Sequence, residues 1–144
     1  SGVSRRERAR AGVACLIHSD DKGKIKGWKF INERILTVDI DEGKEKWTLV
    51  IVYAPNEDDT AENKTRFYET LQRSIEEQER DILILGDLNA RVGKNSEEWD
   101  GVIGNAGEEV LNNNGERLLN LCLMNNLVIL NTMFIHRDIQ ERVY

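Results

Sequence analysis

Proline and cysteine are both scarce in this sequence, with one Pro and two Cys among 144 residues. Long apolar runs are absent as well. The longest, such as 11–17 and 49–54, reach roughly seven residues, whereas a membrane span needs about 20. We therefore expect no transmembrane helix. The first ten residues are basic and no apolar stretch with a small-residue cleavage site follows them, so we expect no signal peptide.

The two cysteines, Cys15 and Cys122, lie in apolar segments. Neither belongs to a CxxC motif or to the Cys/His spacing of a zinc site. Their surroundings predict reduced thiols in the core. Such thiols fit an intracellular, reducing compartment. We therefore expect the protein in the nucleus or the cytoplasm, without a membrane partner.

Positive charge is not in excess either: 20 basic and 26 acidic residues give a formal net charge of −6. This balance argues against a protein that binds nucleic acid through bulk electrostatics, so any DNA contact must be local. The one basic cluster consists of four arginines within residues 1–10. We interpret it as a flexible basic arm in solvent, with a contact to phosphates as the alternative.

The length suits one domain, and no repeat or linker divides the chain. Leu36, Val38 and Ile40 alternate with polar residues, which predicts a strand with one buried face. Turn residues 41–44 would join this strand to the next in an antiparallel hairpin. Pro55 would end the second strand, because proline has no amide hydrogen for the ladder. The predicted strands are Ala11–His18, Phe30–Ile40, Trp47–Ala54, Asp81–Leu85 and Leu127–Leu130.

Two segments show helical spacing. Asp59 and Glu62 resemble a capping box, and the four-residue spacing of Phe67, Leu71 and Ile75 predicts a helix over 61–78. Asn113 and Glu116 suggest a second capping box. The second helix would end near Asn125 or Asn126 and bury an apolar stripe of Leu118, Leu119, Cys122 and Leu123. Alternating strands and helices from Trp47 onward predict an α/β (or α+β) layered fold.

Polar residues gather where two predicted strands end, at Tyr53–Asn56 and Gly86–Asn89. Asp87 and Asn89 are two positions apart and would point the same way in an extended chain. A carboxylate and an amide suit Mg²⁺, or a phosphate together with an attacking water. Asp and Asn are also common turn residues, and Tyr53 is equally an ordinary strand residue. The long Gly/Asn-rich stretch up to Asn114 should be functional or contain small elements.

Three strings in order, Ile51–Asn56 (IVYAPN), Leu83–Ala90 (LILGDLNA) and Asn113–Leu118 (NNGERL), resemble the endonuclease/exonuclease/phosphatase superfamily. The closest resemblance is to the apurinic-type endonuclease domain of non-LTR retrotransposons and the related craniofacial development protein 2 group. This resemblance implies a four-layer α/β/β/α sandwich. It also implies a Mg²⁺-dependent phosphodiesterase that hydrolyses DNA, since the retrotransposon members nick target DNA.

The resemblance also implies roles for four residues. Tyr53 matches the tyrosine near the scissile phosphate, and Asn56 would help to position that phosphate. Asp87 matches the aspartate that orients and deprotonates the attacking water. Asn89 matches the asparagine that holds a phosphate oxygen.

Parts of the family pattern have no match in this chain. The expected metal-binding Glu and the Ser-Asp-His sequence are missing: neither His18 nor His136 has that context, and Glu33 matches a solvent-facing hairpin position. The resemblance thus implies that residues 1–144 form a single partial domain, incomplete at both ends, whose isolated chain is inactive. Mg²⁺ binding would be weak or absent, with Asp87 and Asn89 as the metal candidates. Exposed sheet edges would favour a homodimer or strand exchange.

Two other functions stay open on the sequence. The first is a non-catalytic protein-interaction module that keeps the fold without the chemistry. The second is a phosphatase that acts on a small phosphorylated molecule, because the superfamily includes such enzymes.

Overall fold

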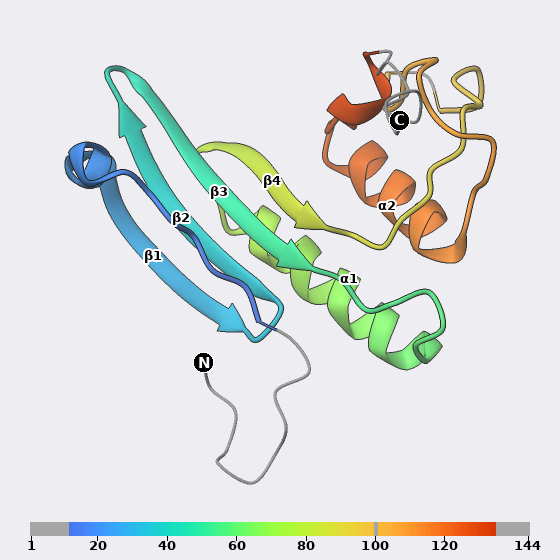
Figure 1. Ribbon diagram of the computed structural model, residues 1–144, viewed down its shortest axis with the longest axis horizontal. Coiled ribbons are helices and arrows are strands. Elements are labelled where there is room, and N and C mark those ends of the chain that lie inside the picture. Colours follow the sequence, from blue (N-terminus) through green and yellow to red (C-terminus); the bar gives the residue numbers. More distant parts are fainter. Residues whose placement is uncertain (1–11, 100, 135–144) are drawn as a thin grey trace, which may run out of the picture. The chain divides into compact units, whose positions relative to one another are not determined.

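A computed structural model describes residues 12–99 and 101–134. It is a mixed α+β structure, and the chain divides into two compact units, residues 1–89 and 90–144 (Figure 1). The first unit contains a 3-10 helix, four strands and a long helix. These are η1 (Ser19–Lys24), β1 (Ile25–Asn32), β2 (Ile35–Glu42), β3 (Glu45–Tyr53), α1 (Ala61–Glu76) and β4 (Asp81–Asp87). The second contains α2 (Asn113–Met124) and η2 (Leu130–Thr132).

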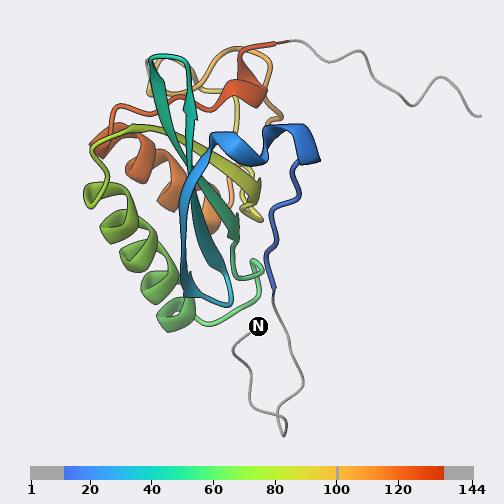
Figure 2. The same ribbon diagram turned by 90° about the vertical axis from the view of Figure 1, so that its left-hand side faces the viewer.

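The four strands form one sheet in the order β1-β2-β3-β4. β1, β2 and β3 are antiparallel neighbours, whereas β3 and β4 run parallel and are connected through α1 (Figures 1 and 2). The predicted β2–β3 hairpin is confirmed, and Gly43 takes a φ of 64° in its turn. The prediction of one strand over 30–40 is wrong. A turn at Glu33 and Arg34 separates β1 from β2, and the exposed position of Glu33 is as expected.

Helix α1 covers one face of the sheet. Phe67, Leu71 and Ile75 are buried, as their spacing predicts. They lie on the same side of the sheet as Val50 and Val52. Thr48 on β3 faces α1, because its hydroxyl donates to Gln78 just beyond that helix. Val50 and Val52 follow Thr48 at two-residue spacing and therefore share its face. The predicted Asp59/Glu62 capping box is wrong by one residue. The N-cap is Thr60, whose side chain accepts from the Asn63 amide at 3.2 Å.

The opposite face of the sheet is apolar but largely open. Trp28, Phe30 and Leu85 are 71%, 47% and 42% exposed. Ile35 and Thr37 are buried on the α1 face while Val38 is buried on the other, so the prediction of one buried face for this strand is wrong. The strand register places two rows on the open face: Trp28, Val38, Leu49 and Leu83, then Phe30, Leu36, Ile51 and Leu85.

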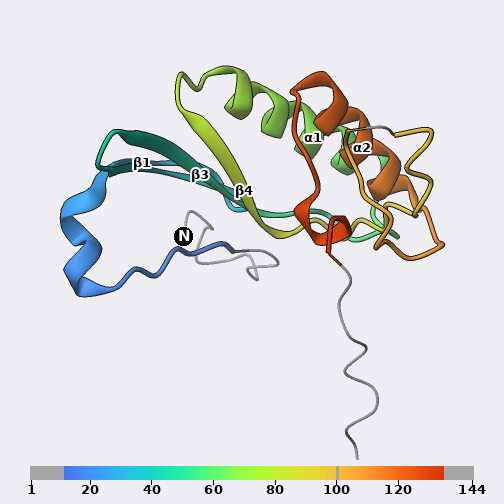
Figure 3. The same cartoon turned by 90° about the horizontal axis from the view of Figure 1, so that it is seen from above.

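The predicted first strand is not formed. Residues 12–18 have no regular structure and run on the side of the sheet opposite α1 (Figures 1 and 3). Leu16 is 91% exposed, so this segment covers little of the open face. Its apolar composition favours a strand, but no strand of the described residues pairs with it. Ala11, residues 1–10 of the expected arm, and His136 lie outside the described residues.

In the second unit, α2 begins one residue earlier than predicted, because the sequence suggested Asn113 as the capping residue. Its N-cap is Asn112, which accepts from the Gly115 amide at 2.8 Å. Leu118, Leu119 and Cys122 are buried as expected, but Leu123 is 55% exposed and Leu121 takes the core position instead. The long preceding stretch contains a small element, a β-bridge between Val92 and Leu111.

The predicted final strand at 127–130 is wrong. Residues 127–129 are irregular and η2 follows. The Ile129 amide donates to the Val102 carbonyl at 2.8 Å, and the hydroxyl of buried Thr132 accepts from the Gly104 amide at 2.9 Å. These single hydrogen bonds fix residues 129–132 in place without the repeated bonds of a β-ladder. Among the helices of the described residues, none has the length and apolarity to cross a membrane.

Candidate functional site

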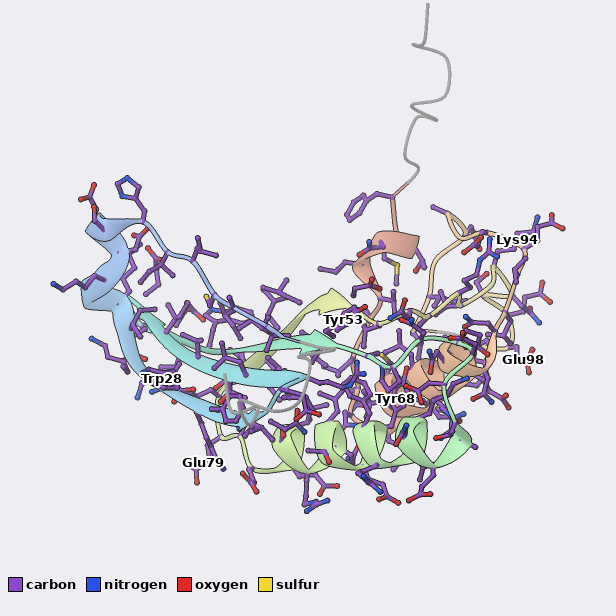
Figure 4. All side chains as sticks on the ribbon, turned by 60° about the horizontal axis from the view of Figure 1, so that its bottom comes forward. Trp28, Tyr53, Tyr68, Glu79, Lys94 and Glu98 are labelled. Atoms are coloured by element: carbon purple, nitrogen blue, oxygen red, sulfur yellow. The ribbon has the colours of Figure 1, made fainter. Side chains whose placement is uncertain are left out.

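The structure places Tyr53 and Asp87 side by side. They are register partners at the ends of β3 and β4. The Ala54 amide donates to the Asp87 carbonyl at 2.8 Å and so continues the pairing by one more bond. Partners on neighbouring strands point to the same face, here the one opposite α1. Tyr53 is half-buried and Asp87 is exposed; Figure 4 shows Tyr53 where β3 ends.

Asn89 ties the two strand ends together. Its side-chain nitrogen donates to the Ala54 carbonyl at 3.0 Å, and its backbone amide donates to Asp87 Oδ1 at 2.9 Å. The expectation that Asp87 and Asn89 project in parallel from an extended chain is wrong. β4 ends at Asp87, and Asn89 has a left-handed φ of 48°, so the chain turns between them. Because of this turn, the backbone amide of Asn89 still lies next to the Asp87 carboxylate.

Gly86 allows β3 and β4 to approach at the site. Its φ is 140°, and a Cβ built there would lie 1.9 Å from the Val52 carbonyl oxygen. Any other residue would therefore push β4 away from β3 immediately before Asp87. This explains the glycine in the Gly-Asp-Leu-Asn string physically.

Asn56 stands at the start of the loop between β3 and α1, and its side chain is exposed. Its carbonyl accepts from the Asp59 amide at 3.1 Å. The next residue is anchored by Lys64, which is 5% exposed: its ammonium group donates to the Glu57 carbonyl and lies 3.4 Å from the Glu57 carboxylate. Buried Lys64 thus fixes the loop that carries Asn56.

Arg34 is a neighbour of the site that sequence reasoning missed. Its guanidinium lies 5.6 Å from the centroid of the Tyr53 ring and donates to the Tyr53 carbonyl at 3.1 Å. The Tyr53 amide donates in return to the Arg34 carbonyl at 3.0 Å. The register of the β2–β3 hairpin would have predicted this contact, because pairing Ile35 with Val52 brings Arg34 beside Tyr53.

The strand ends present a phenol, a carboxylate and an amide, but their donor set is short for a metal ion. Asp87 supplies one carboxylate, and the described residues contain no group of three His, Cys, Asp or Glu side chains placed to hold a metal. Mg²⁺ prefers six oxygen ligands and uses one or two carboxylates with water and substrate phosphate. The residues described here therefore do not form a Mg²⁺ site by themselves.

The first unit also contains a pocket of about 210 Å³, of whose lining residues Arg34 is the one that contacts Tyr53. It lies between the β1–β2 turn, the β3–α1 loop and α1. Asp59 in its wall accepts from the Asn63 side chain and the Thr60 amide, and these bonds lower the pKa of its carboxyl. The lining residues are Asn32, Glu33, Arg34, Pro55, Asp59, Asn63, Arg66, Phe67 and Thr70.

Comparison with known proteins gives one consistent result. The chain is 37% identical over 127 residues to craniofacial development protein 2 of Bos taurus and 35% identical over 127 residues to that of Tragulus javanicus. The chain is similar to part of craniofacial development protein 2. The expected resemblance to the craniofacial development protein 2 group is thus confirmed. No protein-family model matches the chain.

The two matches include 87% of this chain but only 21% and 22% of the craniofacial development protein 2 sequences. The chain thus spans about a fifth of the length of the curated relatives that it matches. All four predicted site residues lie in the first unit. Tyr53 is the register partner of Asp87, and Asn89 donates to Asp87.

Proposed function

We propose that the chain is part of an endonuclease-like domain of the endonuclease/exonuclease/phosphatase type, derived from a retrotransposon. The complete domain would hydrolyse phosphodiester bonds of DNA with Mg²⁺, in the nucleus or the cytoplasm. The observation that carries the proposal is the pairing of Tyr53 with Asp87 at the joined ends of β3 and β4. It brings a phenol, a carboxylate and an amide to one place on the sheet.

In this proposal each residue acts on one phosphodiester. The Asp87 carboxylate takes a proton from a water molecule whose oxygen attacks phosphorus, while the bond from phosphorus to the 3′ oxygen breaks. The 3′ oxygen then takes a proton from solvent and leaves as a 3′ hydroxyl. The Tyr53 hydroxyl donates to a non-bridging phosphate oxygen on which negative charge increases. Asn56 and Asn89 hold the phosphate in line for the attack. A magnesium ion would neutralise phosphate charge, with ligands besides Asp87 from outside the described residues.

The open sheet face supports the four-layer part of the proposal. A sheet with two apolar faces is stable when both are covered. Helix α1 covers one face (Figure 3). Trp28, Phe30 and Leu85 are largely exposed on the other. A second sheet packed there would complete an α/β/β/α sandwich. Without it, the apolar face and the edge strands β1 and β4 favour a homodimer or strand exchange.

A nicking assay tests the proposed function. The chain, and a longer protein that contains it, are incubated with supercoiled plasmid and Mg²⁺. We expect nicking by the longer protein, loss of at least about 100-fold in Asp87→Ala, and little change in Asp81→Ala. Asp81 is the matched control, because it is an exposed aspartate at the opposite end of β4. Nicking that survives Asp87→Ala contradicts the assignment.

The same open face favours a second candidate, a protein-interaction module that keeps the fold without chemistry. Exposed Trp28 and Phe30 are the residue types that dominate protein interfaces. The nicking assay separates the two, because a module would leave the plasmid intact in the longer protein as well. Release of inorganic phosphate from small phosphomonoesters, without competition by DNA, would instead indicate a phosphatase.

A further inference from the structure

Tyr53 is held on two sides of its strand. On the β4 side, bonds from the Ala54 amide and the Asn89 side chain fix the strand end. On the β2 side, Arg34 makes three contacts with Tyr53. The Tyr53 amide donates to the Arg34 carbonyl at 3.0 Å, and Arg34 Nη1 donates to the Tyr53 carbonyl at 3.1 Å. The guanidinium also lies over the Tyr53 ring, 5.6 Å from its centroid. Arg34 therefore contacts both the backbone and the ring of Tyr53.

Arg34 is itself fixed in the turn between β1 and β2. It is half-buried, and its backbone amide donates to Asn32 Oδ1 at 2.8 Å. No ion pair within the described residues includes Arg34. By contrast, three other arginines each pair with a carboxylate within 2.8 Å, namely Arg66, Arg80 and Arg91. The Arg34 guanidinium is thus placed against an aromatic ring and a carbonyl instead of a carboxylate.

This contact bears on where the Tyr53 hydroxyl lies. A half-buried tyrosine can adopt different staggered χ1 rotamers, and each rotamer moves the hydroxyl to a different place. A cation over one face of the ring is attracted by the π electrons and favours the rotamer that keeps the contact. A hydrogen-bond donor serves a reaction only when it lies about 3 Å from the oxygen on which charge increases. A residue that fixes the ring therefore fixes the donor.

We infer that Arg34 is the positioning residue of Tyr53. It holds the ring in the rotamer that directs the hydroxyl to the phosphate oxygen, and it acts through Tyr53 without contacting the substrate. This inference rests on the proposed function, since it concerns the same site. It gives a role to the β1–β2 turn, which lies outside the predicted set of site residues.

Side-chain NMR of the chain tests whether Arg34 holds the ring. We expect the Hα–Hβ couplings of Tyr53 in the parent to be those of a single staggered χ1 rotamer. In Arg34→Gln the couplings should become averaged over rotamers. Arg73→Gln is the matched control, because Arg73 is an exposed arginine on α1, and it should leave the couplings unchanged. Averaged couplings in the parent, or couplings that Arg34→Gln does not alter, overturn the inference.

Kinetics of plasmid nicking by the longer protein test whether the fixed ring serves the reaction. Tyr53→Phe removes the donor and should lower kcat about 100-fold. Arg34→Gln keeps the donor but not its orientation, so it should lower kcat about tenfold and leave KM and its salt dependence unchanged. When Tyr53→Phe is already present, Arg34→Gln should cost less than about twofold, because no hydroxyl is left to position. Arg73→Gln should nick as the parent does.

The outcomes separate this inference from the proposed function. A tenfold loss that persists beside Tyr53→Phe indicates a general structural role for Arg34 and overturns the inference. A raised KM with a weaker salt dependence indicates a direct phosphate contact and overturns it as well. Both results leave the proposed function standing. A parent protein that does not nick contradicts the proposed function, whereas the Tyr53 couplings still decide whether Arg34 holds the ring.

Discussion

Tyr53 and Asp87 occupy the same register position on parallel strands, and the bond from the Ala54 amide to the Asp87 carbonyl fixes that position. The two side chains come from separate parts of the sequence, one before helix α1 and one after it. The crossover through α1 makes β3 and β4 parallel, and so brings the carboxyl ends of both strands to one edge of the sheet. Every role proposed for the site depends on this meeting.

The close approach at Gly86 should make that position intolerant of a side chain. Gly86→Ala places a Cβ 1.9 Å from the Val52 carbonyl oxygen and adopts a φ of 140° that alanine avoids. We expect a loss of about 3 kcal/mol or more in the free energy of unfolding, measured by urea denaturation. Gly43→Ala is the matched control, since its φ is also positive but its Cβ meets open space. A cost there of about 1 kcal/mol is expected, and equal costs at both sites would contradict the packing.

Acid should weaken the bond between Arg80 and Asp41. Arg80 Nη1 lies 2.5 Å from Asp41 Oδ1, and this hydrogen bond lowers the pKa of the Asp41 carboxyl below its ordinary 3.8. A carboxyl whose pKa is lowered on folding stabilises the fold above the ordinary value, and the stabilisation is lost as pH falls through the folded value. Arg80→Gln should therefore return the Asp41 pKa, followed by NMR, toward 3.8, while Arg73→Gln leaves it unchanged. An Asp41 pKa unaltered by Arg80→Gln contradicts the pairing.

Cys122 should behave as an inert core thiol. Burial raises its pKa from 9.0 to about 11. In the unfolded chain the thiol ionises near its ordinary value, so its contribution to stability is present below about pH 9 and declines toward pH 11. Cys122→Ala should reduce the fall in stability over that interval. A thiol reagent at pH 8 should modify half-buried Cys15 first and reach Cys122 only on unfolding; faster labelling of Cys122 would contradict its burial.

Local patterns predicted the elements that depend on local chemistry. The β2–β3 hairpin, the buried stripe of α1 and the strand before Gly86 follow from turn residues and hydrophobic spacing. The predicted start of the first helix at residue 61 is confirmed, but both predicted capping residues are wrong by one position, because Asp59 and Asn113 stand next to the true caps, Thr60 and Asn112. Several polar residues in a row can each accept an amide hydrogen, and only the path of the chain decides which one does.

Non-local contacts account for what the sequence could not predict. The apolar composition of 12–18 and 127–130 is that of strands, but a strand forms only where a neighbour offers a ladder. Within the described residues neither segment has one. Arg34 was missed for a related reason. It is remote from Tyr53 in sequence and becomes its neighbour only through the β2–β3 register.

The most direct test asks whether Tyr53 and Asp87 act on one phosphate. A double-mutant cycle measures DNA oligonucleotide affinity for the parent chain, Tyr53→Phe, Asp87→Asn and the double variant. Tyr53→Phe loses a donor and should weaken binding about fivefold, whereas Asp87→Asn loses a repelling charge and should strengthen it. We predict a coupling of at least about 0.5 kcal/mol, absent when Asp81→Asn replaces Asp87→Asn. Effects of Tyr53→Phe and Asp87→Asn that add within about 0.3 kcal/mol would contradict a shared site.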